Sequence, residues 1–276
     1  MKNKSRLLQQ MMTGPYLFWS AAFIIIPLIM IIYYGLTNDQ GHFTLLNLAK
    51  ITTQENLKAL GLALLLAFIS TLLCLLLAYP LAMILTTLAV NQSSFIVLVF
   101  ILPMWMNSLL RIIAWQNLLE KNGVINMLLH FLHLPNLEII NTPYAIILGM
   151  VYDFLPFMVL PLYNVLSKMD KNIINAAYDL GANNVQTFFS VILPLSLPGI
   201  ISGVTMVFVP ALTTFVISEL LGGSKILLIG NVIEQEFKQG SSWHTGSGLS
   251  LVLMIFIIFS MALIAKYDKD GEGTAF

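Results

Sequence analysis

The chain has 276 residues, of which 58% are hydrophobic and only 9% are charged. A soluble globular domain carries about 25% charged residues, so this composition, with a mean hydropathy of +0.87, predicts a polytopic membrane protein. The 13 basic and 13 acidic residues cancel, so no net charge favours nucleic acid as a partner. A single cysteine, Cys74, excludes an intrachain disulfide.

Hydrophobic segments long enough to cross a bilayer define the predicted elements. A membrane-spanning helix needs about 20 mostly apolar residues. In chain order, the six segments that qualify are Tyr16–Leu36, Leu57–Thr87, Ser94–Ala114, Tyr144–Leu166, Leu195–Ile217 and Leu249–Ala265. The first of them is long and has no small-residue cleavage site, so it predicts a retained anchor rather than a signal peptide. We therefore expect an all-α fold of six transmembrane helices.

Basic residues near the first span set the expected orientation. Lys2, Lys4 and Arg6 precede it with no acidic residue among them. Because cytoplasmic segments of membrane proteins are enriched in basic residues, the N-terminus is expected inside. Six spans then place the C-terminus and the 168–193 loop in the cytoplasm, and the 115–142 loop, which includes an amphipathic stretch, outside.

The third predicted span ends with a cation, and the fifth ends with a carboxylate. Arg111 is expected to complement the C-terminal end of the third span and to reach the membrane interface. Glu219, at the outer end of the fifth span, either guards the entrance of a substrate pathway or lies among the lipid headgroups. Gly199 and Gly203, within the fifth span, form a GxxxG pair that permits close helix packing.

Asp153 stands near the middle of the fourth span, where an ionised carboxylate costs about 2.5–3.5 kcal/mol on insertion scales. Phe157 and Asn164 follow at offsets of four and eleven residues, so one helix face carries a carboxylate, an aromatic ring and an amide. This combination suits an elongated organic polycation, through charge pairing and cation–π attraction. Alternatively, Asp153 caps a backbone broken near Pro156 or bonds to a neighbouring helix.

The polar stretch between the fourth and fifth spans predicts two short helices. Asp170 is a suitable N-cap for a helix that starts at Lys171, and Gly181 stands where helices commonly end in a left-handed residue. Asn183 can cap the second helix, which leads to Pro194 and the fifth span. The result is a helix-turn-helix with small residues on one face. It is either a docking site for a soluble partner or an ordinary loop packed on its own bundle.

This stretch resembles the EAA loop of ABC-importer permeases, whose pattern is Glu-Ala-Ala, three residues, Gly, nine residues and Ile-x-Leu-Pro. Asn175 replaces the usual glutamate, and Val191 stands at the isoleucine position. The resemblance implies that this loop couples the chain to an ATPase subunit. The expected coupling residues are Asn175, Ala176, Ala177, Asp179, Gly181, Leu193 and Pro194. The resemblance implies the type I ABC importer permease fold. It implies a permease domain over residues 57–262, an N-terminal anchor region over 1–56 and a cytoplasmic tail over 263–276.

Three further segments, 102–111, 155–163 and 220–233, resemble the B-subunit permeases of spermidine/putrescine importers. The resemblance implies polyamine import through the inner membrane from an extracytoplasmic binding protein. It also implies a second homologous permease subunit and two copies of an ATPase subunit that hold ATP and Mg²⁺. This chain would then be no enzyme and would bind no cofactor or metal, in agreement with its lack of a GxxxxGK[ST] motif.

Two alternatives to polyamine import stay open. Permeases for thiamine, ferric ion and sulfate share the same loop, so their substrates are the nearest competitors. A gradient-driven secondary transporter would also use an intramembrane carboxylate and proline-broken helices, but it would need no cytoplasmic docking helix.

Overall fold

The computed structural model describes residues 14–87, 102–223, 225–238 and 243–265. The chain divides into two compact units, one of residues 1–57 and 232–256 and the other of residues 58–231 and 257–276. Within the described ranges the regular elements are helices, and the β structure is limited to one isolated bridge between Thr37 and Phe43.

The smaller unit is built around the first and last long helices. Its elements are η1 (Ala21–Ile25), α2 (Ile26–Gly35), α3 (Leu46–Ala49), η2 (Lys50–Thr52), most of α14 (Ile229–Lys238) and the first part of α15 (Trp243–Ala265). The end of α2 lies against α15, because a Cβ added at Gly35 would come within 3.2 Å of the Ser247 carbonyl oxygen. The Asn47 side-chain amide donates to the Thr37 carbonyl oxygen at 2.9 Å and so fixes the connection that follows α2.

The larger unit holds the remaining helices. In chain order they are α4 (Gln54–Thr87), η3 (Leu102–Trp105), α6 (Ser108–Leu119), α7 (Val124–Phe131), α8 (Pro143–Ser167), α9 (Lys171–Asp179), α10 (Asn184–Thr187), η4 (Phe188–Ile192), α11 (Leu193–Leu195), α12 (Leu197–Thr213) and α13 (Val216–Gly222). The 34 residues of α4 correspond to about 51 Å of helix, which exceeds the hydrocarbon thickness of about 30 Å.

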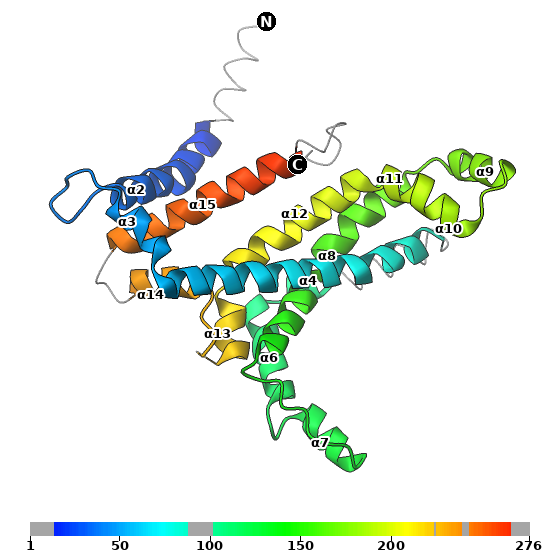
Figure 1. The fold of residues 1–276 in the computed structure, drawn as a ribbon, viewed down its shortest axis with the longest axis horizontal. Coiled ribbons are helices and arrows are strands. Elements are labelled where there is room, and N and C mark those ends of the chain that lie inside the picture. Colours follow the sequence, from blue (N-terminus) through cyan, green and yellow to red (C-terminus); the bar gives the residue numbers. More distant parts are fainter. Residues whose placement is uncertain (1–13, 88–101, 224, 239–242, 266–276) are drawn as a thin grey trace, which may run out of the picture. The chain divides into compact units, whose positions relative to one another are not determined.

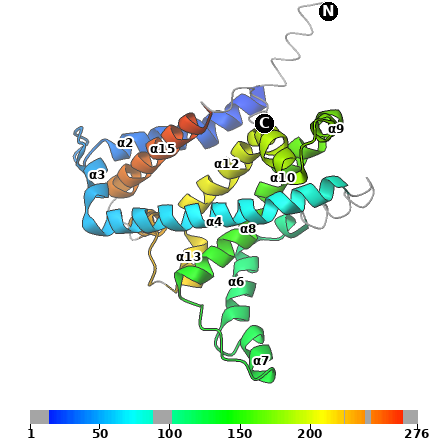
Figure 2. The same ribbon diagram turned by 45° about the vertical axis from the view of Figure 1, so that its right-hand side comes forward.

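The central packing of the larger unit is that of α12 along α8, which run side by side in both ribbon views (Figure 1, Figure 2). The two glycines of the GxxxG pair, Gly199 and Gly203, allow the two helices to approach closely. A Cβ added at Gly199 would lie 3.1 Å from the Pro161 carbonyl oxygen, and one added at Gly203 would lie 2.6 Å from Met158 Sδ. The expected role of the GxxxG pair in close helix packing is confirmed.

Four described helical stretches are long and apolar enough to span a membrane: Gly14–Gly35, Gln54–Thr87, Pro143–Ser167 and Trp243–Ala262. They correspond to the first, second, fourth and sixth predicted spans. The pair Asn184–Leu195 and Leu197–Thr213, bent by 64°, can form one further span. Part of the remaining predicted span, Ser94–Ala114, lies outside the described residues, which resume at 102.

Two spans predicted as continuous helices are interrupted, so those predictions are wrong in detail. In the third, the described part is a 3₁₀ turn followed by α6, and the Asn107 side chain caps α6 by accepting from the Leu109 N–H at 2.9 Å. In the fifth, α12 ends at Thr213, and Glu219 lies on the separate helix α13. Thr214, the C-cap residue of α12, has an extended backbone with ψ of 140°, which ends the helix.

Candidate functional site

The helix-turn-helix between α8 and α12 forms as the sequence predicts. Asp170 caps α9 by accepting from the Asn172 N–H at 2.9 Å. Gly181 has φ of +87°, and the N–H groups of Gly181 and Ala182 bond to the carbonyl oxygens of Tyr178 and Ala177 at 2.9 and 3.0 Å. These two bonds are those of a Schellman motif, in which the left-handed residue is usually glycine.

The second helix of this hairpin begins with a reciprocal cap. The Asn183 side chain accepts from the Gln186 N–H, and the Gln186 side chain accepts from the Asn183 N–H, both at 2.9 Å. This capping box satisfies two donors at the start of α10 without help from other parts of the chain. The turn between α9 and α10 is therefore fixed by its own residues.

The surface of this helix-turn-helix carries apolar side chains that no other described residue buries. Leu180 is 90% exposed, and Ile173, Tyr178 and Val185 are also exposed. The small residues that carry the motif lie in the same helix, with Ala176 exposed and Ala177 half-buried. Asn175 and Asp179 are exposed polar neighbours. These apolar side chains are not packed on the chain's own bundle in the described structure, and the assignment of a docking role stays a prediction.

The hairpin is joined to the bundle by aromatic and hydroxyl contacts. Phe188 packs edge-on against Tyr79 of α4, with ring centroids 5.4 Å apart. The Tyr79 hydroxyl in turn hydrogen-bonds the Ser196 hydroxyl at 2.7 Å, beside the predicted Leu193 and Pro194 at the start of the next helix. These contacts join the hairpin to α4 and to the residue that precedes α12. Tyr79 and Ser196 carried no sequence signal for this role, because they lie far apart in the chain.

Asp153 is paired with a basic residue from another helix. Its carboxylate lies 2.6 Å from the Arg111 guanidinium of α6, and the two residues are only 8% and 7% exposed. The expectation that Arg111 reaches the interface at a helix end is therefore wrong. Arg111 lies within α6 and faces α8, where the buried carboxylate offsets its charge. This is the bond to a neighbouring helix that was considered as the alternative role for Asp153.

The other predicted pathway residues have different surroundings. Phe157, one turn beyond Asp153 on α8, is half-buried, and Asn164 is exposed. Glu219 is exposed on α13. The assignment of these residues and Asp153 to a substrate pathway stays a prediction.

A buried asparagine organises the break after α12. The Asn231 amide donates to the Phe215 carbonyl oxygen at 3.0 Å, and its side-chain oxygen accepts from the Leu228 N–H at 3.1 Å. The Ser218 hydroxyl donates to the same oxygen. Asn231 therefore ties the start of α13 to the residue that precedes α14.

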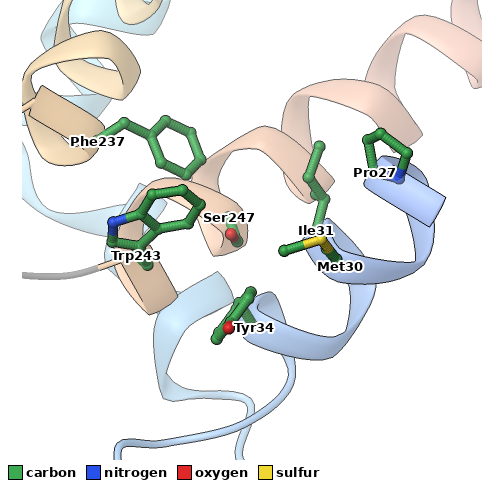
Figure 3. A pocket seen from close by; sticks show the side chains of 7 residues that line it. All are labelled: Pro27, Met30, Ile31, Tyr34, Phe237, Trp243 and Ser247. Atoms are coloured by element: carbon green, nitrogen blue, oxygen red, sulfur yellow. The ribbon is translucent and has the colours of Figure 1, made fainter. Parts of the chain in front are cut away.

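The smaller unit contains an apolar cavity of about 240 Å³. Its lining residues are Pro27, Met30, Ile31, Tyr34, Phe237, Trp243 and Ser247. Figure 3 shows the rings of Phe237 and Trp243 on one side of this space and Met30 and Ile31 of α2 on another. No acidic side chain lines it, so it lacks the group needed to pair with an ammonium.

The long apolar helices define a multi-pass membrane protein. A family model described as a binding-protein-dependent transport system inner membrane component matches residues 78–268, and the chain belongs to this family of ABC-importer permeases. The match includes α8, the helix-turn-helix and α12.

Curated relatives match over nearly the whole chain. The spermidine/putrescine transport system permease protein PotB of Haemophilus influenzae is 38% identical, over 87% of this chain and 88% of the relative. PotB of Escherichia coli (strain K12) is 40% identical, over 86% of this chain and 89% of the relative. The Escherichia coli inner membrane ABC transporter permease protein YdcU is 29% identical, over 81% of this chain and 75% of the relative.

Solved structures support the fold. A chain of a bacterial ABC transporter involved in import of the acidic polysaccharide alginate has a TM-score of 0.78 and 16% identity, over 95% of this chain and 96% of that chain. The alginate transporter in complex with an alginate-bound periplasmic protein gives a TM-score of 0.79 at 14% identity. At this identity the likeness concerns the fold, and it confirms the type I ABC importer permease fold.

Proposed function

We propose that this chain is the permease subunit of an ATP-driven importer for spermidine and putrescine. The observation that carries the substrate class is the identity of 38–40% to PotB proteins, over 86–92% of this chain. The membrane-embedded carboxylate of Asp153 could pair with an organic polycation only if its ion pair with Arg111 opens.

The proposed assembly contains this chain, a second homologous permease, two ATPase subunits and an extracytoplasmic binding protein. ATP and Mg²⁺ belong to the ATPase subunits, and this chain binds no cofactor. The complex lies in the inner membrane, with both termini of this chain in the cytoplasm. The uncovered apolar residues of the helix-turn-helix support ATPase docking on that side.

Vesicles reconstituted with the purified complex test the proposed function. We expect uptake of labelled spermidine only when ATP and the binding protein are both present. A pH gradient or a membrane potential without ATP should give no uptake. Transport by this chain alone under such a gradient would instead identify a secondary transporter.

Competition in the same vesicles tests the substrate class. Unlabelled putrescine should reduce the uptake of labelled spermidine, whereas thiamine, ferric ion and sulfate at equal concentration should not. Inhibition by one of the latter solutes, with ATP-dependent uptake of that solute, would retain the importer and replace the polyamine assignment.

A substitution pair tests the docking surface. Ala176→Trp places a large ring on an exposed small residue of α9, and we expect it to prevent co-purification of the ATPase while membrane insertion continues. Asn122→Trp gives the control, since it places the same ring on an exposed residue of the 115–142 loop, which is expected on the opposite side of the membrane. Normal co-purification with Ala176→Trp would show that the ATPase docks elsewhere.

A further inference from the structure

Two contacts join α6 to α8, and they lie side by side. The first is the buried pair of Arg111 and Asp153, with the charged atoms 2.6 Å apart. The second is an aromatic pair, in which the rings of Trp115 and Tyr152 meet edge to face with centroids 5.3 Å apart. Trp115 follows Arg111 by one helical turn, which is about 6 Å along the axis, and Tyr152 directly precedes Asp153.

The two contacts differ in their access to the surroundings. Arg111 and Asp153 are almost fully buried, whereas Tyr152 is 39% exposed and Trp115 is half-buried. Trp115 is nearer than Arg111 to the 115–142 loop, and Tyr152 is nearer than Asp153 to the start of α8, which follows that loop. With the N-terminus inside, the aromatic pair therefore lies on the extracytoplasmic side of the ion pair.

The guanidinium of Arg111 is incompletely bonded for a buried group. Its Nε and Nη1 atoms, and also Oδ1 of Asp153, are buried and have no hydrogen-bond partner in the described structure, so the 2.6 Å contact is an ion pair without hydrogen-bond geometry. A guanidinium offers five N–H donors, and a buried ion pair is stable only when the remaining donors are satisfied. Arg111 thus neutralises Asp153, but its guanidinium has fewer hydrogen bonds than a buried charged group needs.

The charge of Arg111 can be replaced by one that a substrate carries. If Arg111 moved away without replacement, Asp153 would remain as a bare carboxylate inside the membrane, which is unfavourable. A primary ammonium has the same single positive charge, so its exchange for the guanidinium leaves the net charge of the site unchanged. Aromatic faces next to the carboxylate add cation–π attraction for the incoming group.

We propose that Arg111 is an exchangeable counter-cation for Asp153, and that an ammonium group of an organic polycation takes its place during transport. Trp115 and Tyr152 receive the ammonium first, and Asp153 then binds it when α6 and α8 separate. Return of Arg111 to Asp153 displaces the substrate and closes the site. This exchange rests on the proposed polyamine import, and it assigns the substrate contact to residues that also hold the resting structure together.

Chemical rescue of a missing cation tests binding without measuring transport. We expect spermidine to raise the unfolding temperature of the purified Arg111→Gln complex by more than it raises that of the wild type, because the substrate supplies the absent charge. Sodium chloride of equal ionic strength should not do so. The matched control is Arg111→Gln/Asp153→Asn, in which both charges are removed and spermidine should give no extra shift. Equal shifts in the three proteins would overturn the exchange.

Uptake by the same variants separates exchange from a purely structural ion pair. Asp153→Asn should reduce spermidine uptake by at least about tenfold, as expected when one partner of a buried charge contact is removed. Arg111→Gln should lower KM and also lower kcat, because substrate binds a freed carboxylate but is no longer displaced. The double variant should insert normally and transport as poorly as Asp153→Asn.

Restored uptake in the double variant would overturn the proposal, because a structural pair can be replaced by two neutral residues. This outcome differs from failure of the proposed function, in which the wild-type complex itself would not import spermidine. Trp115 supplies a further check, since Trp115→Leu should raise KM and Trp115→Phe should retain most of the affinity. An unchanged KM in Trp115→Leu would remove the aromatic pair from the site.

Discussion

Gly181 ends α9 in a left-handed backbone conformation that L side chains rarely adopt. Its φ is +87°, and an L-residue in a left-handed conformation is less stable by roughly 1–2 kcal/mol. We expect Gly181→Val to reduce ATP-dependent uptake strongly without reducing membrane insertion, because the turn to α10 must change its backbone. The measurements are uptake per inserted complex and ATPase co-purification.

Gly61 provides a matched control for this substitution. A Cβ added at either Gly61 or Gly181 would meet no atom within 4 Å, so the two positions differ in backbone conformation rather than in space. Gly61→Val in α4 should therefore leave uptake near the wild-type level. Equal loss in both variants would attribute the effect to bulk, and normal uptake in Gly181→Val would make the hairpin a simple connection.

Residues whose roles depend on near neighbours in sequence could be predicted, and those with distant partners could not. Asp170, Asn183 and Gly181 act within a few residues of their own positions, so their caps were readable from the sequence. Arg111 was misplaced because its partner, Asp153, lies on another helix. Each residue alone was consistent with several environments, and only packing of α6 on α8 selects one.

At the scale of elements, hydrophobicity predicted where apolar segments lie but not where they break. The segment Leu195–Ile217 has no charged residue, yet α12 ends at Thr213 and α13 starts at Val216. The Phe215 carbonyl oxygen accepts from the Glu219 N–H, which starts α13, and also from the Asn231 amide. Because Asn231 lies in a later helix, α14, no periodicity within the span could reveal this interruption.

The packing of α12 on α8 allows a prediction for a single methyl group. In Gly203→Ala the added Cβ would lie 2.6 Å from Met158 Sδ, so the two helices must separate or Met158 must move. Overpacking of this kind costs typically about 1–3 kcal/mol, and we expect a lower unfolding temperature of the purified complex.

The neighbouring side chain offers a compensating change. Removing the thioether in Gly203→Ala/Met158→Ala leaves room for the new methyl group, so the double variant should recover part of the stability lost in Gly203→Ala. Met158→Ala alone should be destabilised, because it leaves a cavity at a fully buried position. If the losses of stability in the two single variants simply add in the double variant, the close approach of α12 to Met158 is not the cause of the instability of Gly203→Ala.

At the scale of the whole molecule, the orientation in the membrane depends on few charges. The 13 basic residues are spread along the chain, and the acid-free group Lys2, Lys4 and Arg6 sets the predicted direction of the first helix. This direction decides on which side the helix-turn-helix meets its partner and from which side a substrate meets Trp115 and Tyr152. A single orientation must therefore place the helix-turn-helix in the cytoplasm and the aromatic pair of Trp115 and Tyr152 toward the outside.

Single-cysteine labelling tests this orientation directly. Cys74 is the one cysteine of the chain and is buried, so Cys74→Ala gives a background without thiols. Lys121→Cys and Lys171→Cys then place one thiol in the 115–142 loop and one in α9, at positions that are both exposed. A membrane-impermeant maleimide should reach Lys121→Cys in intact right-side-out membrane vesicles, and it should reach Lys171→Cys only after the vesicles are permeabilised. The reverse order would place the helix-turn-helix outside, where a cytoplasmic ATPase could not bind it. The expected order places the aromatic pair of Trp115 and Tyr152 on the side from which a binding protein delivers its substrate.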